Sequence, residues 1–366
     1  MKFNFSATKI YLFIEVAAST FFPMIFVASS LYQVTVAGLT PLQLVLVGTA
    51  LEVSAFIFEI PTGVVADIYS RRLSIIIGYI LMGLGFMVEG FFPAFVPILL
   101  AQVIWGLGYT FTSGASQAWI SDEIGEDKAN KLFLRATRFG QYAALLGTGL
   151  AVLVGGENVA MPIRLGGTGV FLIGVALMLT MPETGFKPTP KEDRDTWGQM
   201  AYTFREGIKA VRARPRLKTI LWIGLFYGLY SEGFDRLWVK HLIDNFELPA
   251  LFMSNQVAFF GVVRAIGTVL TIIAMRSIEK RLDTSQPQAI GRAMLFVTGL
   301  ISVSLIGYAI SPLLIVTLGI FLLIMVLRRV AIPLYTSWVN QKLDSETRAT
   351  VLSISSQVDA VGQIAG

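Results

Sequence analysis

The chain has 366 residues, of which 54% are hydrophobic and only 14% are charged, and its mean hydropathy is +0.68. A soluble domain carries about 25% charged residues, so this composition excludes a soluble globular protein and predicts an all-α, polytopic membrane protein. Cysteine is absent and His241 is the single histidine, which argues against disulfides, thiolate catalysis and a histidine-built metal site. We therefore expect no metal and no cofactor.

Ten apolar runs are long enough to cross a bilayer, since about 20 residues suffice for a helix. The first run exceeds the apolar core of a cleaved signal peptide, so we expect a retained first helix. An eleventh run begins near Thr347 and stops at Gly366, about a turn or two short of a full span, which indicates a chain truncated within this helix. The ten spans are 10–32, 41–66, 73–92, 95–120, 136–156, 160–181, 218–239, 250–275, 290–310 and 312–337.

The basic residues follow a membrane topology and do not indicate nucleic-acid binding. Of the 29 Lys and Arg residues, only Arg164 and Lys240 lie in odd-numbered loops, whereas most of the others lie at the amino terminus and in even-numbered loops. Short cytoplasmic loops carry the excess of positive charge. We therefore expect a multi-pass protein of the cell (inner or plasma) membrane with a cytoplasmic amino terminus.

The longest loop divides the chain into two similar halves. We expect an N-terminal bundle at 1–181, a linker at 182–217 and an incomplete C-terminal bundle at 218–366. Within the linker, apolar residues from Trp197 to Val211 recur at helical spacing, which predicts an amphipathic helix on the membrane surface or, alternatively, a solvated linker helix. The halves also echo each other, because Arg135-Ala136-Thr137 opens the fifth span and Arg348-Ala349-Thr350 opens the eleventh.

The stretch Gly63 to Arg72 connects the second and third spans. It resembles the loop signature of the major facilitator superfamily, Gly-x-x-x-Asp-Arg-x-Gly-Arg-Arg, and departs from it at Ile68 and Ser70. The matching residues are Gly63, Asp67, Arg71 and Arg72. The resemblance implies a six-plus-six helix repeat, here without its last helix or so, and a transporter with its substrate site between the halves.

The resemblance also implies that these four residues form a gate. Asp67 would approach the amino end of the eleventh helix, where Asp344 or Ser345 could cap the unpaired amides. Gly63 would permit close helix approach. The two arginines would hold the loop at the anionic leaflet, or act only as topological anchors.

Charged side chains inside the spans cost about 2.5 to 3.5 kcal/mol each at a helix centre, so we expect them to face protein or water. Those on helices that line the cavity in this family, or in the eleventh span, are candidate proton or substrate sites, together with the neutral Gln357: Glu15, Glu232, Asp235, Arg236, Arg328, Arg329 and Asp359. Glu232 and Arg236 are four apart and are predicted to pair. Candidate interhelix charges are Glu52, Glu59 and Arg264.

Proton coupling would fall to carboxylates, because no histidine lies in any span and a carboxylate desolvated between helices can bind a proton near working pH. Glu15, with no base nearby in sequence, is the first candidate, and Asp359 is the second. Gln102 stands where many family members carry an arginine, and the stretch Gly147 to Ala151 lacks the proline of the antiporter signature. The route of proton transfer and the direction of transport therefore stay open.

The interpretation is a secondary transporter that exports small amphipathic or lipophilic compounds with protons, because the stretches Ser113 to Trp119 and Ser356 to Ala360 resemble bacterial drug-efflux members. The main alternative is cation-coupled uptake of an organic anion or metabolite, which the intramembrane arginines would bind. A transport-inactive receptor or regulator is the third. The sequence offers no nucleophile paired with a base, so it does not indicate an enzyme. The expected partners are the lipid bilayer, a small-molecule substrate and protons, with no nucleic acid.

Overall fold

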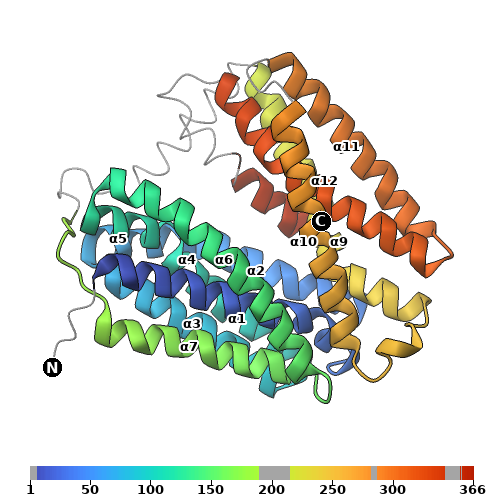
Figure 1. The fold of residues 1–366 in the computed structure, drawn as a ribbon, viewed down its shortest axis with the longest axis horizontal. Coiled ribbons are helices and arrows are strands. Elements are labelled where there is room, and N and C mark those ends of the chain that lie inside the picture. The colour runs from blue at the N-terminus through green and yellow to red at the C-terminus, as the bar shows by residue number, and fades with distance from the viewer. Residues whose placement is uncertain (1–5, 189–214, 282–286, 343–354, 356) are drawn as a thin grey trace.

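The computed structural model describes residues 6–188, 215–281, 287–342, 355 and 357–366, which form helices joined by short turns (Figure 1). Two bundles follow each other along the chain. The predicted amphipathic helix in the linker, the candidate caps Asp344 and Ser345, and the Arg348 echo lie outside the described residues.

The first bundle contains α1 to α7. Its second helix begins at a capping box, in which the Thr40 hydroxyl accepts from the Gln43 amide and the Gln43 side chain accepts from the Thr40 amide. Pro41 follows at the first helical position, where its missing amide costs nothing. The helices are α1 (Ala7–Thr35), α2 (Pro41–Val64), α3 (Arg71–Phe91), α4 (Phe95–Thr112), α5 (Ala115–Ile124), α6 (Glu126–Gly155) and α7 (Met161–Thr180).

The second bundle contains α9 to α12 and the end of the chain. Its core includes Trp238, which stacks on Phe321 with ring centroids 4.2 Å apart, and Tyr308, whose hydroxyl donates to the Trp238 carbonyl at 2.9 Å. Residues 357–365 are helical, and Gly362 packs closely on Gly228 of α9. The helices are α9 (Pro215–Asn245), α10 (Gln256–Arg281), α11 (Pro287–Ile310) and α12 (Leu314–Lys342).

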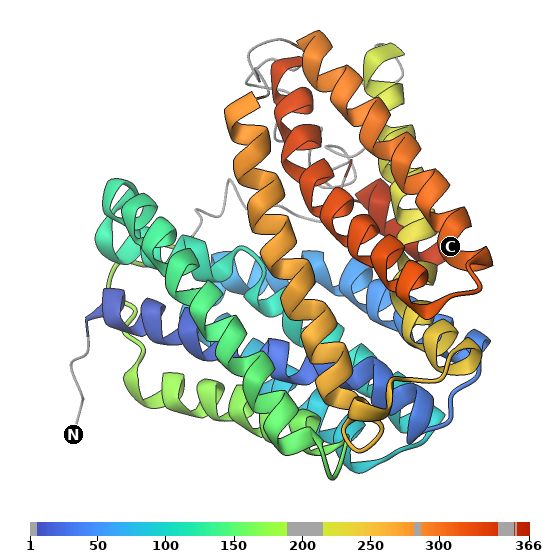
Figure 2. The ribbon, with the colours of Figure 1, turned by 45° about the vertical axis from the view of Figure 1, so that its right-hand side comes forward.

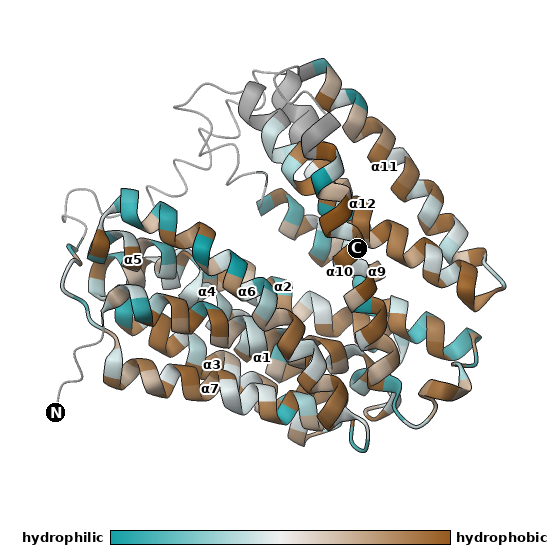
Figure 3. Cartoon of the chain, viewed as in Figure 1, coloured by the Kyte–Doolittle hydropathy of each residue, from teal (hydrophilic) through white to brown (hydrophobic). Residues whose placement is uncertain are grey.

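Both bundles expose apolar side chains on their outside. Among the described residues, eight helical segments are long and apolar enough to cross a membrane. Leu153, Leu179, Leu295 and Ile315 are each more than 70% exposed, and Figure 3 shows hydrophobic residues along the helices of both bundles. Such surfaces are costly in water and suit a lipid environment.

Several predicted spans differ from the structure, as three examples show. The span predicted at 95–120 is divided into α4 and α5, because Gly114 adopts a φ of 69° that most other residues avoid. The span predicted at 136–156 begins ten residues earlier, at Glu126, where two acidic residues favour the positive end of a helix. The span predicted to end at residue 66 continues as a further helical turn, the π-helix Val65–Tyr69.

The two bundles touch near one end of each. Asn255, just before α10, donates to the Val152 carbonyl of α6 at 3.0 Å, and a Cβ built on Gly155 would lie 2.9 Å from Val257 of α10. Nearby, Gly48 of α2 lies against α9. We call the contact of the α10 region with α6, together with the contact of α9 with α2, the seam.

The opposite end of the first bundle carries Arg71, Arg72 and Lys128, and we call it the basic end. The two bundles are inclined to each other, and the basic end lies away from the second bundle (Figures 1 and 2). The structure therefore holds the bundles together at the seam and apart at the basic end.

Candidate functional site

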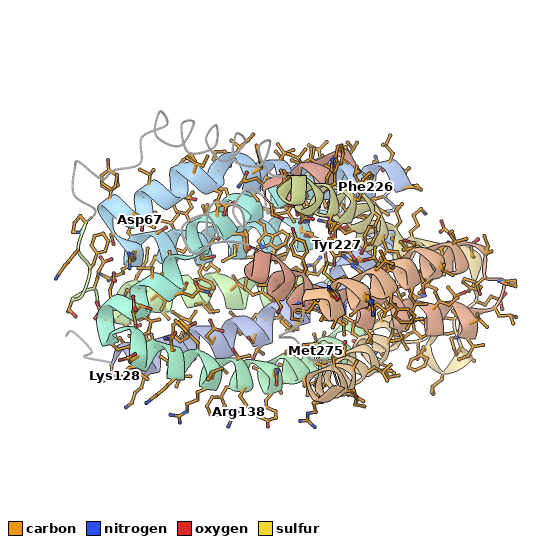
Figure 4. All side chains as sticks on the ribbon, turned by 90° about the horizontal axis from the view of Figure 1, so that it is seen from above. Asp67, Lys128, Arg138, Phe226, Tyr227 and Met275 are labelled. Carbon is orange, nitrogen blue, oxygen red and sulfur yellow. The ribbon has the colours of Figure 1, made fainter. Side chains whose placement is uncertain are left out.

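The loop motif lies at the basic end, where α2 passes into the π-helix Val65–Tyr69. Asp67 sits in this π-helical turn with 59% of its side chain exposed, 3.8 Å from Arg71 Nη2. Arg71 also forms an ion pair with Asp122 of α5. Figure 4 shows Asp67 and Lys128 at the same end of the first bundle. A π-turn is rare and frequent at functional sites, and here it brings Asp67 within reach of the first turn of α3.

Arg72, the second arginine of the motif, is held by groups at the end of α7 and just beyond it. The Arg72 guanidinium donates to the Met178 carbonyl at 2.7 Å, and its backbone amide donates to Glu183 at 2.9 Å. Glu183 also accepts from the Ser70 hydroxyl at 2.6 Å. Its carboxylate thus caps the positive end of α3. Asp122 and Glu183 were missed in the sequence, although both lie just beyond apolar spans, where a partner for a basic loop could be sought.

The chain after α7 is fastened to the same end. Glu123 accepts from the backbone amides of Thr184 and Gly185 at 2.5 and 2.7 Å, and the Trp119 indole donates to the Pro182 carbonyl at 2.8 Å. The Phe186 ring lies 5.9 Å from the Arg71 guanidinium. We call residues 182–186 with these contacts the linker anchor.

A second polar group lies within the second bundle. Arg328 of α12 forms a two-point ion pair with Asp235 of α9, at 2.5 and 2.8 Å. Its guanidinium also lies 5.8 to 5.9 Å from the ring centres of Tyr227, Tyr230 and Phe234. Half of the Asp235 side chain remains exposed. These five residues form the Arg328 site, a charged pair enclosed by aromatic rings.

The predicted pair between Glu232 and Arg236 is confirmed, with Arg236 Nε 2.6 Å from Glu232 Oε1. The pair packs directly on Gly48 of α2, so it belongs to the seam. Glu52, one turn further along α2, interacts electrostatically with both members of the pair and with Asp359. Carboxylates of the two bundles therefore face each other around one arginine.

The remaining predicted residues are more scattered. Glu15 lies beside Tyr11 and Tyr79 within the first bundle, and Glu59 and Arg329 are exposed. Arg264 interacts electrostatically with Asp235 and Arg329, and Asp359 accepts from Gln363 at 2.8 Å. Gln357 is half-buried, and a Cβ on Gly63 would meet nothing within 4 Å, so the close approach expected at Gly63 is not made in this conformation.

One carboxylate that was not selected from the sequence is the most buried of all. Glu89 of α3 is 0% exposed, and neutral side chains of α1 and α4 surround it. The signal was its isolation, because Glu89 is the single charged residue in the apolar run 73–92.

Comparison with known proteins decides the family. The family model described as Major Facilitator Superfamily matches residues 7–366. The chain belongs to the major facilitator superfamily. It is thus an all-α membrane transporter and not an enzyme, and the resemblance inferred from the loop motif is confirmed.

Relatives of this major facilitator chain match it over most of its length, and solved transporters share its fold. It is 25% identical over 326 residues to the "Uncharacterized MFS-type transporter YxaM" of Bacillus subtilis (strain 168). This match covers 88% of the chain and 78% of the relative. The solved nucleoside transporter NupG matches 99% of the chain, and 89% of NupG is covered, with a TM-score of 0.76 at 13% identity. A D-xylose-proton symporter covers 98% of the chain and is itself covered over 87%, with a TM-score of 0.63 at 15% identity.

Proposed function

We propose that this chain is a secondary transporter that works by alternating access and exports small amphipathic or lipophilic compounds in exchange for protons. The observation that supports it best is the arrangement of the bundles, which meet at the seam and lie apart at the basic end. Rocking about a central site would close one end and open the other. The units that would move are an N-terminal bundle at 1–181 and a C-terminal bundle at 218–366, joined by a linker at 182–217.

We place the basic end in the cytoplasm of a cell-membrane protein, because short cytoplasmic loops carry the excess of Lys and Arg. The start of α1, at Ala7, lies at the same end, so we propose that the amino terminus is also cytoplasmic (Figure 1). The structure would then represent the inward-open state. In the outward-open state Asp67 would meet the start of the eleventh predicted span, near Thr347, and latch the basic ends together.

The Arg328 site is the proposed substrate site. Its aromatic rings offer apolar faces, and the half-exposed Asp235 carboxylate offers a partner for a cationic or hydrogen-bonding group. Cations also bind to aromatic faces. This combination of one charge and several rings suits an amphipathic molecule.

Protons would be carried by carboxylates that lie between the bundles. Glu52 in the first bundle and Asp359 in the second interact electrostatically, and two like charges that share a low-dielectric site favour the uptake of a proton by one of them. Glu15 remains a further candidate on α1.

The alternative function is uptake of an organic anion or metabolite with a cation. The observation that favours it is the pair of arginines Arg264 and Arg329, which lie close enough to interact electrostatically. Against it, Arg236 and Arg328 already hold carboxylates. An anion would have to displace a carboxylate at either residue, which weakens binding.

The test is proton flux in proteoliposomes on addition of lipophilic cations or organic anions, with Asp235→Asn as the variant. Asp244→Asn is the control, because Asp244 is a carboxylate on the same helix whose partner is the neighbouring Lys240. We expect a lipophilic cation to evoke proton flux in the parent and control proteins, and the flux to be lost in Asp235→Asn. Flux evoked only by organic anions would establish the alternative. Silence towards both classes, with the protein shown to be folded, would favour a receptor or regulator.

A further inference from the structure

Glu89 is buried in the last turn of α3, near the seam end of the first bundle. The Ser29 hydroxyl and the Gln33 amide of α1 donate to Oε1 at 2.5 and 2.9 Å, and the Gln102 amide of α4 donates to Oε2 at 3.1 Å. The Tyr32 hydroxyl donates to the Glu89 backbone carbonyl at 2.8 Å. We call Ser29, Gln33 and Gln102 the Glu89 cage. All three partners are neutral, so none of them cancels a charge on the carboxylate.

The cage can hold Glu89 with or without a proton. A hydroxyl both donates and accepts, so Ser29 can donate to the carboxylate or reverse and accept from the carboxylic acid. A second acceptor is available at Gln102, which is 3% exposed and whose Oε1 is buried without a hydrogen-bond partner. The cage therefore offers three donors to the ionised form and at least one acceptor to the protonated form. A purely structural carboxylate would need only the donors.

An aromatic layer separates the cage from the basic end. Phe26, Phe86 and Trp105 lie one turn away from Ser29, Glu89 and Gln102 on the same three helices, in each case toward the basic end. Their ring centroids are 5.3 to 5.9 Å apart. Water from the basic end would have to cross this layer, so protons reach Glu89 more readily from the seam end.

Two arginines of other helices reach the neighbourhood of Glu89. Arg164 of α7 donates to the neighbouring Gly90 carbonyl at 2.8 Å, and it moves with the first bundle. The helix α1, which carries Ser29 and Gln33 of the cage, packs against α9 and α10 of the second bundle, and Arg236 of α9 attracts the Glu89 carboxylate across the seam. Of these two cations, only Arg236 moves away when the seam opens. Because a nearby cation favours the ionised form of a carboxylate, the closed seam and a bound proton oppose each other.

We propose that Glu89 is a proton-binding site whose occupancy is linked to the seam, so that protonation from the seam end favours separation of the bundles there. Linkage is reciprocal, and opening the seam in turn favours proton uptake. The inference goes beyond the proposed function, because it holds whether or not this proton is later carried across the membrane.

The test measures protonation and seam opening separately, in the reconstituted protein. The chain has no cysteine, so nitroxide labels can be placed at Leu42→Cys and Leu251→Cys, two exposed positions at the seam end. Distances between the labels report the open fraction. Infrared difference spectra report the carbonyl stretch of a protonated carboxylic acid, and Glu89→Gln identifies the band that belongs to Glu89.

We expect the ratio of open to closed seams in the parent protein to rise about tenfold or more as the pH falls between about pH 8 and pH 5, together with the infrared band. Glu89→Gln should show the low-pH distribution at every pH. Glu157→Gln, which removes an exposed carboxylate near the seam, should behave as the parent does.

The proposal would be overturned by a Glu89 band that does not change with pH, or by a Glu89→Gln protein that keeps the pH response. If Glu89→Gln does not fold, Ser29→Ala tests the same cage with the carboxylate in place. It should move the midpoint pH of the Glu89 band, and an unmoved midpoint would equally refute the proposal. A failure of proton-coupled transport in proteoliposomes would leave these readouts unaffected, so the two proposals can fail separately.

Discussion

The seam depends on the absence of a side chain at Gly48. A Cβ at this position would lie 2.5 Å from Arg236 Nε and 2.9 Å from Glu232 Cδ, whereas ordinary contacts begin at 3.4 Å. The Glu232 and Arg236 side chains are only 8% and 19% exposed, so they have little room to withdraw. Gly48→Ala should therefore force α2 and α9 apart.

The size of this effect follows from the packing. Adding a methyl group to a closely packed contact costs about 1 to 3 kcal/mol. Separating the two charges would cost about 3 to 5 kcal/mol, so the pair should stay together and move as a unit with α9. The closed seam should thus lose about 1 to 3 kcal/mol relative to the open seam, which is about a 5- to 150-fold change in their ratio.

The assay uses two label pairs in the cysteine-free chain. Leu42→Cys with Leu251→Cys reports the seam end, and Lys128→Cys with Arg276→Cys, both at exposed positions, reports the basic end. In Gly48→Ala the seam distance should lengthen and the basic-end distance should shorten in the same fraction of molecules. Opposite changes at the two ends are what rocking requires.

The control is Gly149→Ala, because a Cβ on this helical glycine would meet nothing within 4 Å. It carries the same change in helix propensity without the contact. The reasoning would be refuted if Gly48→Ala left both distance distributions unchanged, or if Gly149→Ala shifted them equally.

Three other substitutions test local contacts. Gly147→Ala should lower the melting temperature in detergent and Gly149→Ala should not, because only a Cβ at Gly147 would overlap a backbone carbonyl of α1; equal melting temperatures would contradict this packing. Arg328→Lys keeps the charge but loses the two-point contact and the ring stacking, so it should weaken substrate binding about tenfold or more in a titration, whereas Arg329→Lys, at an exposed position, should not. Glu183→Gln removes the negative charge at the start of α3, worth about 0.3 to 1 kcal/mol, so hydrogen exchange of that first turn should become faster; unchanged exchange would show that the cap contributes nothing.

Much of the fold could be predicted from the sequence, because apolar runs of a given length can cross a bilayer in only a few ways. The ten predicted spans all contain helices in the structure. The errors fall where local chemistry overrides hydropathy. Gly114 divides one apolar run, and the charged residues before Ala136 continue a helix that the apolar pattern alone does not reveal.

Less of the site could be predicted, because partners distant in sequence leave no periodic trace. The pair Glu232 and Arg236 was predictable, since four residues bring side chains together on one helix. The contact between Asp235 and Arg328 joins two helices that are distant in sequence, so it was not predictable. The sequence marks Glu89 only as an exception to apolarity, because its role depends on three neutral partners from other helices.

The linker anchor changes where the covalent connection between the bundles begins. Pro182 to Phe186 are tied by hydrogen bonds and a ring contact to α3 and α5, so these residues travel with the first bundle. Tension on the connection would accordingly be applied at Glu183 and the first turn of α3, beside Arg71 and Asp67, and not at the end of α7. The loop motif thus lies beside the point where the connection is attached, and shortening the chain beyond residue 186 should strain this corner of the protein first.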